Sequence, residues 1–184
     1  MRRILVLLAL CAAAPILSAE TVSLGAHGSL ALTVPKGWTL SSQKEQDSGL
    51  AITLSPQSDA NAKAIINVTF IADPQPVGRA EVEEKVRTIG EQFVDASVEK
   101  KETLRDLPAG GGAIGSYCVF TDASMVGQPP KKDEFKVIAV GIIRFTDDVM
   151  AAFSLAADSE KGPEFTALVS ALSSAVYTPA RHAP

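Results

Sequence analysis

The chain has 184 residues, 17 Lys and Arg against 21 Asp and Glu, and a formal net charge of −4. This balance excludes nucleic acid as an expected partner, because affinity for phosphate backbones comes largely from clustered Lys and Arg. The length predicts one domain with one hydrophobic core.

The first nineteen residues have the pattern of a Sec-type signal peptide. A basic pair at positions 2 and 3 precedes an apolar run over residues 4–17 and a small-residue junction. The apolar run is shorter than the ~20 residues that a membrane-spanning helix needs. We predict cleavage between Ala19 and Glu20, so that the mature protein is periplasmic or secreted. Its 15 Lys and Arg against 21 Asp and Glu give a net charge of −6.

The segment after this junction predicts a β-hairpin followed by further strands. Short alternating runs over Val22–Leu24 and Leu30–Val34 flank a Gly25–Gly28 turn. The sequence VPKGW then ends the strand with a Pro-Gly turn and returns Trp38 to the core. Two β-branched runs bounded by turn-forming residues predict strands within Gly49–Pro56 and Lys63–Pro74.

The pattern then changes to a helical period. Val82, Val86, Ile89 and Phe93 recur at steps of four and three, which predicts an amphipathic helix. Gly90 within it suggests close packing, because glycine costs up to about 1 kcal/mol relative to alanine in a helix.

Three strands and a closing helix are predicted for the rest of the chain. The strands are expected in AIGSYCVFTDA, EFKVIAVGIIRF and DVMAAFSLAA. The helix is expected in GPEFTALVSALSSAVY, with Pro163 in its first turn and Val176 on its apolar face. This order predicts an α+β fold in which helices cover an antiparallel sheet, as one domain over residues 20–178 with a flexible tail over 179–184.

Four stretches carry a resemblance to a known family. VPKGW, IINVTFIADPQPVGRAEVEEKV, GSYCVF and GPEFTALVSALSS resemble the PsbP-like domain family, which includes the photosystem II extrinsic PsbP protein and bacterial DcrB-type envelope proteins. The resemblance spans essentially the mature chain. It implies an α/β/α sandwich used in non-enzymatic accessory or docking roles. It transfers no site residue to this sequence.

Two features of LPAGGGAIGSYCVFTD raise the question of catalysis. Gly110, Gly112 and Gly115 have dinucleotide-loop spacing, but such a loop lies between a strand and a helix, whereas strand-like residues follow here. We therefore interpret the glycines as a hairpin turn. Signal cleavage leaves Cys118 as the only cysteine, and neither His27 nor His182 is placed to act as its base. We expect Cys118 to be a buried, inert thiol.

No catalytic, cofactor or metal site is predicted. The acidic pairs Asp133-Glu134 and Asp147-Asp148 lack the alternating acids and glycine of a calcium loop. Two histidines and one cysteine so distributed do not make a zinc ligand set.

The strand around Ile138–Ile143 is apolar on both sides, which is typical of a central strand covered on both faces. A groove for a lipid or a peptide depends on whether anything covers the second face of the sheet. We consider two functions. The first is a non-catalytic accessory or docking module that binds an envelope protein or component. The alternative is a carrier of a small apolar ligand or lipid.

Overall fold

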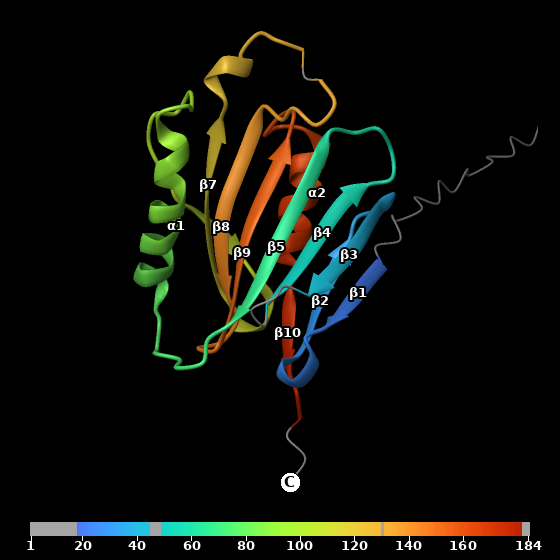
Figure 1. Cartoon of the computed structure of the whole chain (residues 1–184), viewed down its shortest axis with the longest axis vertical. Coiled ribbons are helices and arrows are strands. Elements are labelled where there is room, and N and C mark those ends of the chain that lie inside the picture. The colour runs from blue at the N-terminus through green and yellow to red at the C-terminus, as the bar shows by residue number, and fades with distance from the viewer. Residues whose placement is uncertain (1–17, 45–48, 130, 182–184) are drawn as a thin grey trace, which may run out of the picture.

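The computed structural model describes residues 18–44, 49–129 and 131–181. Over these residues the fold is α+β, with two antiparallel sheets and two α-helices (Figure 1). The predicted fold class, an antiparallel sheet covered by helices, is confirmed.

The small sheet contains three strands in the order β1-β2-β10. β1 (Ser18–Ser23) and β2 (Gly28–Val34) form the predicted hairpin around a 3₁₀ turn at Gly25–His27. The predicted cleavage bond lies inside β1, where Ala19 is opposite Thr33 and Glu20 is opposite Leu32. A chain that begins at Glu20 therefore keeps only the second part of β1.

The large sheet contains seven strands in the order β3-β4-β5-β9-β8-β7-β6. The predicted strands become β4 (Leu50–Pro56), β5 (Ala62–Phe70), β7 (Ile114–Thr121), β8 (Val137–Arg144) and β9 (Val149–Ala157). Two short or polar strands, which the sequence pattern does not predict, form its edges: β3 (Trp38–Lys44) and β6 (Arg105–Pro108). Pro108 is tolerated because an edge strand has one side without ladder hydrogen bonds.

Helix α1 (Arg79–Val94) covers one end of the outer face of this sheet. Val82 and Val86 are fully buried and pack in one cluster with Cys118 and Phe120 of β7. A Cβ at Gly90 would lie 3.1 Å from Phe120 Cζ, so the predicted close packing at this glycine is confirmed.

Helix α2 (Pro163–Ser173) lies on the other side of the large sheet, with the small sheet. The predicted helix is too long at its C-terminal end. Val176 does not continue its apolar face but begins β10 (Val176–Pro179), opposite Ala31 of β2, and is 39% exposed. The run Val-Tyr-Thr-Pro favours an extended backbone, and pairing with β2 satisfies its hydrogen bonds. Of the predicted tail, Pro179 belongs to β10, and residues 182–184 lie outside the described residues.

The main core fills the layer between the large sheet and the second layer formed by α2 and the small sheet. Its largest fully buried side chains are contributed by all three elements: Leu30, Leu32, Ile52, Leu54, Ile66, Ile143, Leu155, Leu168 and Leu172. β8 contributes to both cores, because Ala139 and Ile143 face this layer while Val140 and Ile142 face α1. The prediction that this strand is covered on both faces is confirmed.

Candidate binding surface

The described elements cover only part of the outer face of the large sheet. α1 packs on β7 and β8, and Figure 1 looks onto the uncovered part, with α1 to one side and α2 behind the sheet. On β4, β5 and β9, buried side chains alternate with partly or fully exposed ones. We call these exposed side chains and their neighbours on β3 the open face: Thr39, Ser41, Gln43, Ala51, Thr53, Ser55, Lys63, Ile65, Asn67, Thr69, Ala152, Ser154 and Ala156.

The open face is polar but nearly uncharged. Asn67 lies near its centre, opposite Ala51 of β4 and Ala152 of β9. Thr53 lies opposite Ser41 and Ile65 in the next row. Lys63 is the only charged member of the set. Small hydroxyl, methyl and amide groups on a pleated sheet leave a shallow surface on which both hydrogen bonds and apolar contacts to a partner are available.

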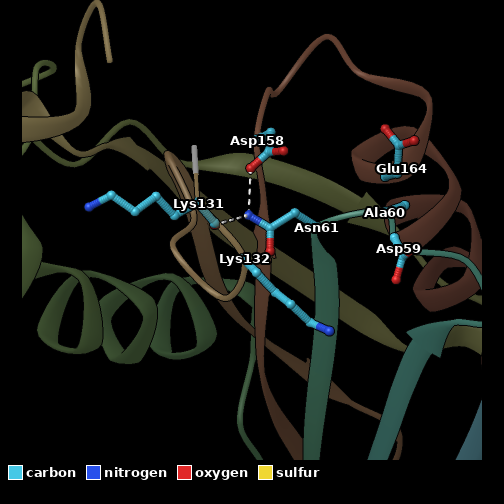
Figure 2. Close-up of a pocket in the computed structure, with 7 residues that line it drawn as sticks. All are labelled: Asp59, Ala60, Asn61, Lys131, Lys132, Asp158 and Glu164. Carbon is cyan, nitrogen blue, oxygen red and sulfur yellow. Dashed lines mark hydrogen bonds between the residues drawn. The ribbon is translucent and has the colours of Figure 1, made fainter. Parts of the chain in front are cut away.

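Two hollows lie where the loop over residues 131–135 approaches β4 and β5. One, of about 310 Å³, is lined by open-face residues Thr53, Ser55 and Lys63 together with Lys132 and Phe135. The other, of about 380 Å³, lies beside it, between this loop, the turn before β5 and α2 (Figure 2). The open face therefore ends in a recessed, polar region.

Asn61 holds this region together. Its Nδ2 donates to Asp158 Oδ1 at 2.8 Å and to the backbone oxygen of Glu134 at 2.7 Å, and its Oδ1 accepts from Asp133 N–H at 3.0 Å. Figure 2 shows Asn61 between Asp158 and Lys131, while the Lys131 and Lys132 side chains extend away from it. The amide is occupied by these contacts, so its role is to fix the loop in place.

The glycine-rich stretch forms a turn, as predicted. Gly111 and Gly112 have φ values of 68° and 80° in a 3₁₀ turn between β6 and β7, and the element that follows is a strand. Gly110 N–H donates to Ala175 O at 3.2 Å, and a Cβ there would lie 2.7 Å from Val176 Cγ2. Gly111 and Gly112 adopt the positive φ angles of the turn, and Gly110 allows close packing against Val176. The turn leads into strand β7 and not into a helix whose N-terminus could bind a pyrophosphate.

Cys118 lies beneath α1 and is fully buried, as predicted. Burial raises the pKa of its thiol, and the Glu102 carboxylate acts in the same direction. His27 lies in the β1–β2 turn, where its ring stacks on Phe70 with centroids 3.8 Å apart. A thiol needs a lowered pKa and access to solvent to act as a nucleophile, and Cys118 has neither.

We expect Cys118 in the folded protein to resist iodoacetamide near neutral pH. Its alkylation should be at least about 100-fold slower than in protein unfolded in urea, because reaction requires opening of the α1 layer. Intact-mass spectrometry over several hours measures both rates, and the unfolded sample controls for reagent activity. Equal rates in the two samples would contradict the buried position of this thiol.

The two acidic pairs stabilise turns. Asp147 forms an ion pair with Arg144, and Thr146 Oγ1 donates to Asp148 Oδ1 at 2.7 Å. Glu134 pairs with Lys131 at 3.4 Å. Within residues 18–44, 49–129 and 131–181, no group of three or more His, Cys, Asp or Glu side chains is arranged to hold a metal ion.

Sequence reasoning missed two polar anchors, Asn61 and Arg144. Arg144 is 13% exposed, donates from Nη1 to Val77 O before α1, and leaves Nε buried without a partner. The partners of Asn61 are distant in the chain, and so is Val77, whose backbone oxygen Arg144 binds. The turn that contains Asp147 was predicted, but its ion pair with Arg144 was not. An isolated Arg ending an apolar strand, as in GIIRF, was the available signal for the second.

Comparison with protein-family models and with curated proteins found no match for this chain. In the described part of the chain, neither helix combines the length and the apolarity needed to cross a bilayer.

Proposed function

We propose that this chain is a periplasmic or secreted, non-catalytic module that binds an envelope protein or envelope component through its open face. The observation that carries the proposal is the incomplete cover of the large sheet: α1 occupies the β7–β8 end, and the rest of the outer face carries no described element. A shallow polar face next to recessed hollows is suited to recognising a macromolecule.

Two properties of the sequence support this proposal. The basic pair, the apolar run and the small-residue junction before Glu20 are typical of an exported protein. The four stretches that resemble the PsbP-like family imply an accessory or docking role.

We favour binding at the surface over carriage of a small apolar ligand. The apolar layer between the large sheet and α2 is occupied by fully buried side chains, among them Leu54, Leu155 and Leu168. The hollows at the end of the open face have lysine and carboxylate side chains in their linings. These linings suit polar partners better than a lipid chain.

Differential capture from an envelope extract of the host tests the proposal. Tagged mature protein is compared with Asn67→Arg, which places a long charged side chain at the centre of the open face, and with the matched control Ser170→Arg on the exposed side of α2. We expect a partner that the wild type and Ser170→Arg enrich equally and that Asn67→Arg recovers at least about tenfold less, since a misplaced interfacial charge costs more than 1.4 kcal/mol.

The proposal fails if Asn67→Arg enriches the same partner as strongly as wild type, or if no component is enriched by any of the three proteins. Thermal unfolding of each variant is measured first, so that loss of binding is not confused with loss of the fold.

A further inference from the structure

β3 is an edge strand with an unusually available backbone. It ends the strand order of the large sheet, and no described strand pairs with its outer side. The other edge strands are shorter: β6 and β10 have four residues each and contain Pro108 and Pro179, and β1 has six. β3 has seven residues, pairs with β4 without a bulge and contains no proline. Natural sheets usually protect long edges of this kind.

The register shows which backbone groups of β3 point away from β4. Gln57 N–H donates to Gly37 O at 2.7 Å, in the same register that places Trp38 opposite Pro56. Because hydrogen-bonded and non-hydrogen-bonded pairs alternate in an antiparallel ladder, Thr39 and Ser41 bond to β4. The N–H and C=O groups of Leu40, Ser42 and Lys44 then point to the outer edge. Trp38 N–H donates to Pro35 O and not to β4, as this alternation requires.

The core is also incompletely covered at this edge, where two apolar side chains of β3 remain partly exposed. Trp38 and Leu40 pack against the main core but are only partly buried, and Ser42 on the same side of the strand is exposed. One more strand beside β3 would cover Trp38 and Leu40 and would pair the outward backbone groups. The chemistry of this edge therefore matches an extended polypeptide and not a small molecule.

The local charge indicates the composition of that polypeptide. β3, β4 and β5 together carry Lys44 and Lys63 and no carboxylate, although the chain as a whole is acidic. Acidic side chains of a bound segment can pair with Lys44 at the end of β3 and with Lys63 on the open face. On the core side of the added strand, apolar side chains would lie against Trp38 and Leu40.

We infer that β3 is the docking edge for an extended segment of a partner protein, one that alternates apolar and polar residues, carries acidic side chains and adds an eighth strand to the large sheet. This inference rests on the proposed binding function and specifies the partner: the segment would pair with β3 while the rest of the partner lies over the adjoining open face.

A displayed library of random twelve-residue peptides is the probe. Peptides selected on the mature chain should show apolar-polar alternation with acidic residues. Ser42→Pro removes one outward N–H and leaves the bonds to β4, so it should weaken peptide binding at least about tenfold, whereas Ser42→Ala should bind as wild type. Hydrogen exchange gives a readout that needs no variant, because saturating peptide should slow exchange of the Leu40 and Ser42 amides.

Three outcomes overturn the inference: no alternating peptide is selected, Ser42→Pro binds the peptides as well as wild type, or protection appears on α1 or β6 instead of β3. A dimer in sedimentation experiments that Ser42→Pro abolishes would also overturn it, since β3 would then pair with a second copy. If the captured envelope partner is lost with Asn67→Arg but kept with Ser42→Pro, the open-face function stands and the edge inference fails.

Discussion

Replacing Gly141 with alanine is expected to destabilise the protein by about 3 kcal/mol or more. Gly141 lies in β8 between Tyr117 of β7 and Phe153 of β9. An added Cβ would lie 2.5 Å from Ser116 O and 2.6 Å from Tyr117 Cβ, and closer still to Phe153 Cζ. The Phe153 ring can rotate, but Ser116 O belongs to the backbone of a central strand. Relief would therefore require the β7–β8 pairing to separate. Urea unfolding followed by circular dichroism measures the change.

Gly111→Ala is the matched control. No atom lies within 4 Å of a Cβ at this position, so the cost comes from its φ of 68° alone and should be about 1 kcal/mol. If Gly141→Ala is no more destabilising than Gly111→Ala, the close approach at β8 is wrong.

Replacing Asn61 with aspartate is expected to destabilise the protein by about 2–3 kcal/mol and to free the loop over residues 131–134. The amide Nδ2 donates to Asp158 Oδ1 and to the backbone oxygens of Lys131 and Glu134. A carboxylate at this position would place an oxygen against these three acceptors, one of which belongs to the Asp158 side chain. Asp133 N–H would remain satisfied, because it donates to the retained Oδ1 position.

The control Asn61→Ala loses the Nδ2 bonds and also the bond from Asp133 N–H, but it adds no repulsion. Its cost should therefore be smaller, about 1 kcal/mol. The difference between Asn61→Asp and Asn61→Ala should shrink as the pH falls from 7 to about 4. Repulsion from the three acceptors raises the pKa of the introduced carboxyl above its ordinary value of about 3.9, so that over this range it becomes protonated and can donate again. Unfolding free energies at pH 7 and pH 3.5 measure both effects. Equal stability of the two variants at pH 7 would show that Asp158 does not face this position.

The strands that sequence reasoning predicted are those with one or two buried faces. In β5 up to Thr69 and in all of β9, buried residues alternate with partly or fully exposed ones. β8 is apolar up to Arg144, because one of its sides packs under α1 and the other faces the main core. α1 was predicted from one apolar stripe, and its bounds agree with the pattern. In each case the side of the element that is buried in the fold carries apolar residues at a regular spacing, and this spacing is visible in the sequence.

The strands that were missed have little burial of their own. β3 has only Trp38 and Leu40 against the core, and its last four residues are exposed. β6 contains Pro108, and β10 follows α2 so directly that Val176 continues the helical spacing by coincidence. These strands form because they pair with a neighbouring strand. Such pairing does not require apolar residues at a regular spacing, so the sequence shows no pattern that predicts them.

The candidate binding surface was less predictable than the fold. Small polar residues on β4 and β5 indicate an uncovered side, yet they do not show that α1 stops at β8. The Asn61 contacts join residues separated by 70 to 97 positions, so only the assembled fold brings them together. Predicting the buried state of Cys118 succeeded because a thiol in an apolar strand without a local base has few other roles.

The sequence by itself determined the helix and strand periods, the inert environment of Cys118 and the turn at Gly110–Gly112, because each depends on residues close together in the chain. Tertiary structure alone decided three features of the described chain: which part of the large sheet its elements leave exposed, which edge strand has backbone groups that no described strand pairs, and how Asn61 holds the neighbouring loop. These features depend on contacts between distant segments, whose positions follow from the packing of whole layers and not from any local pattern.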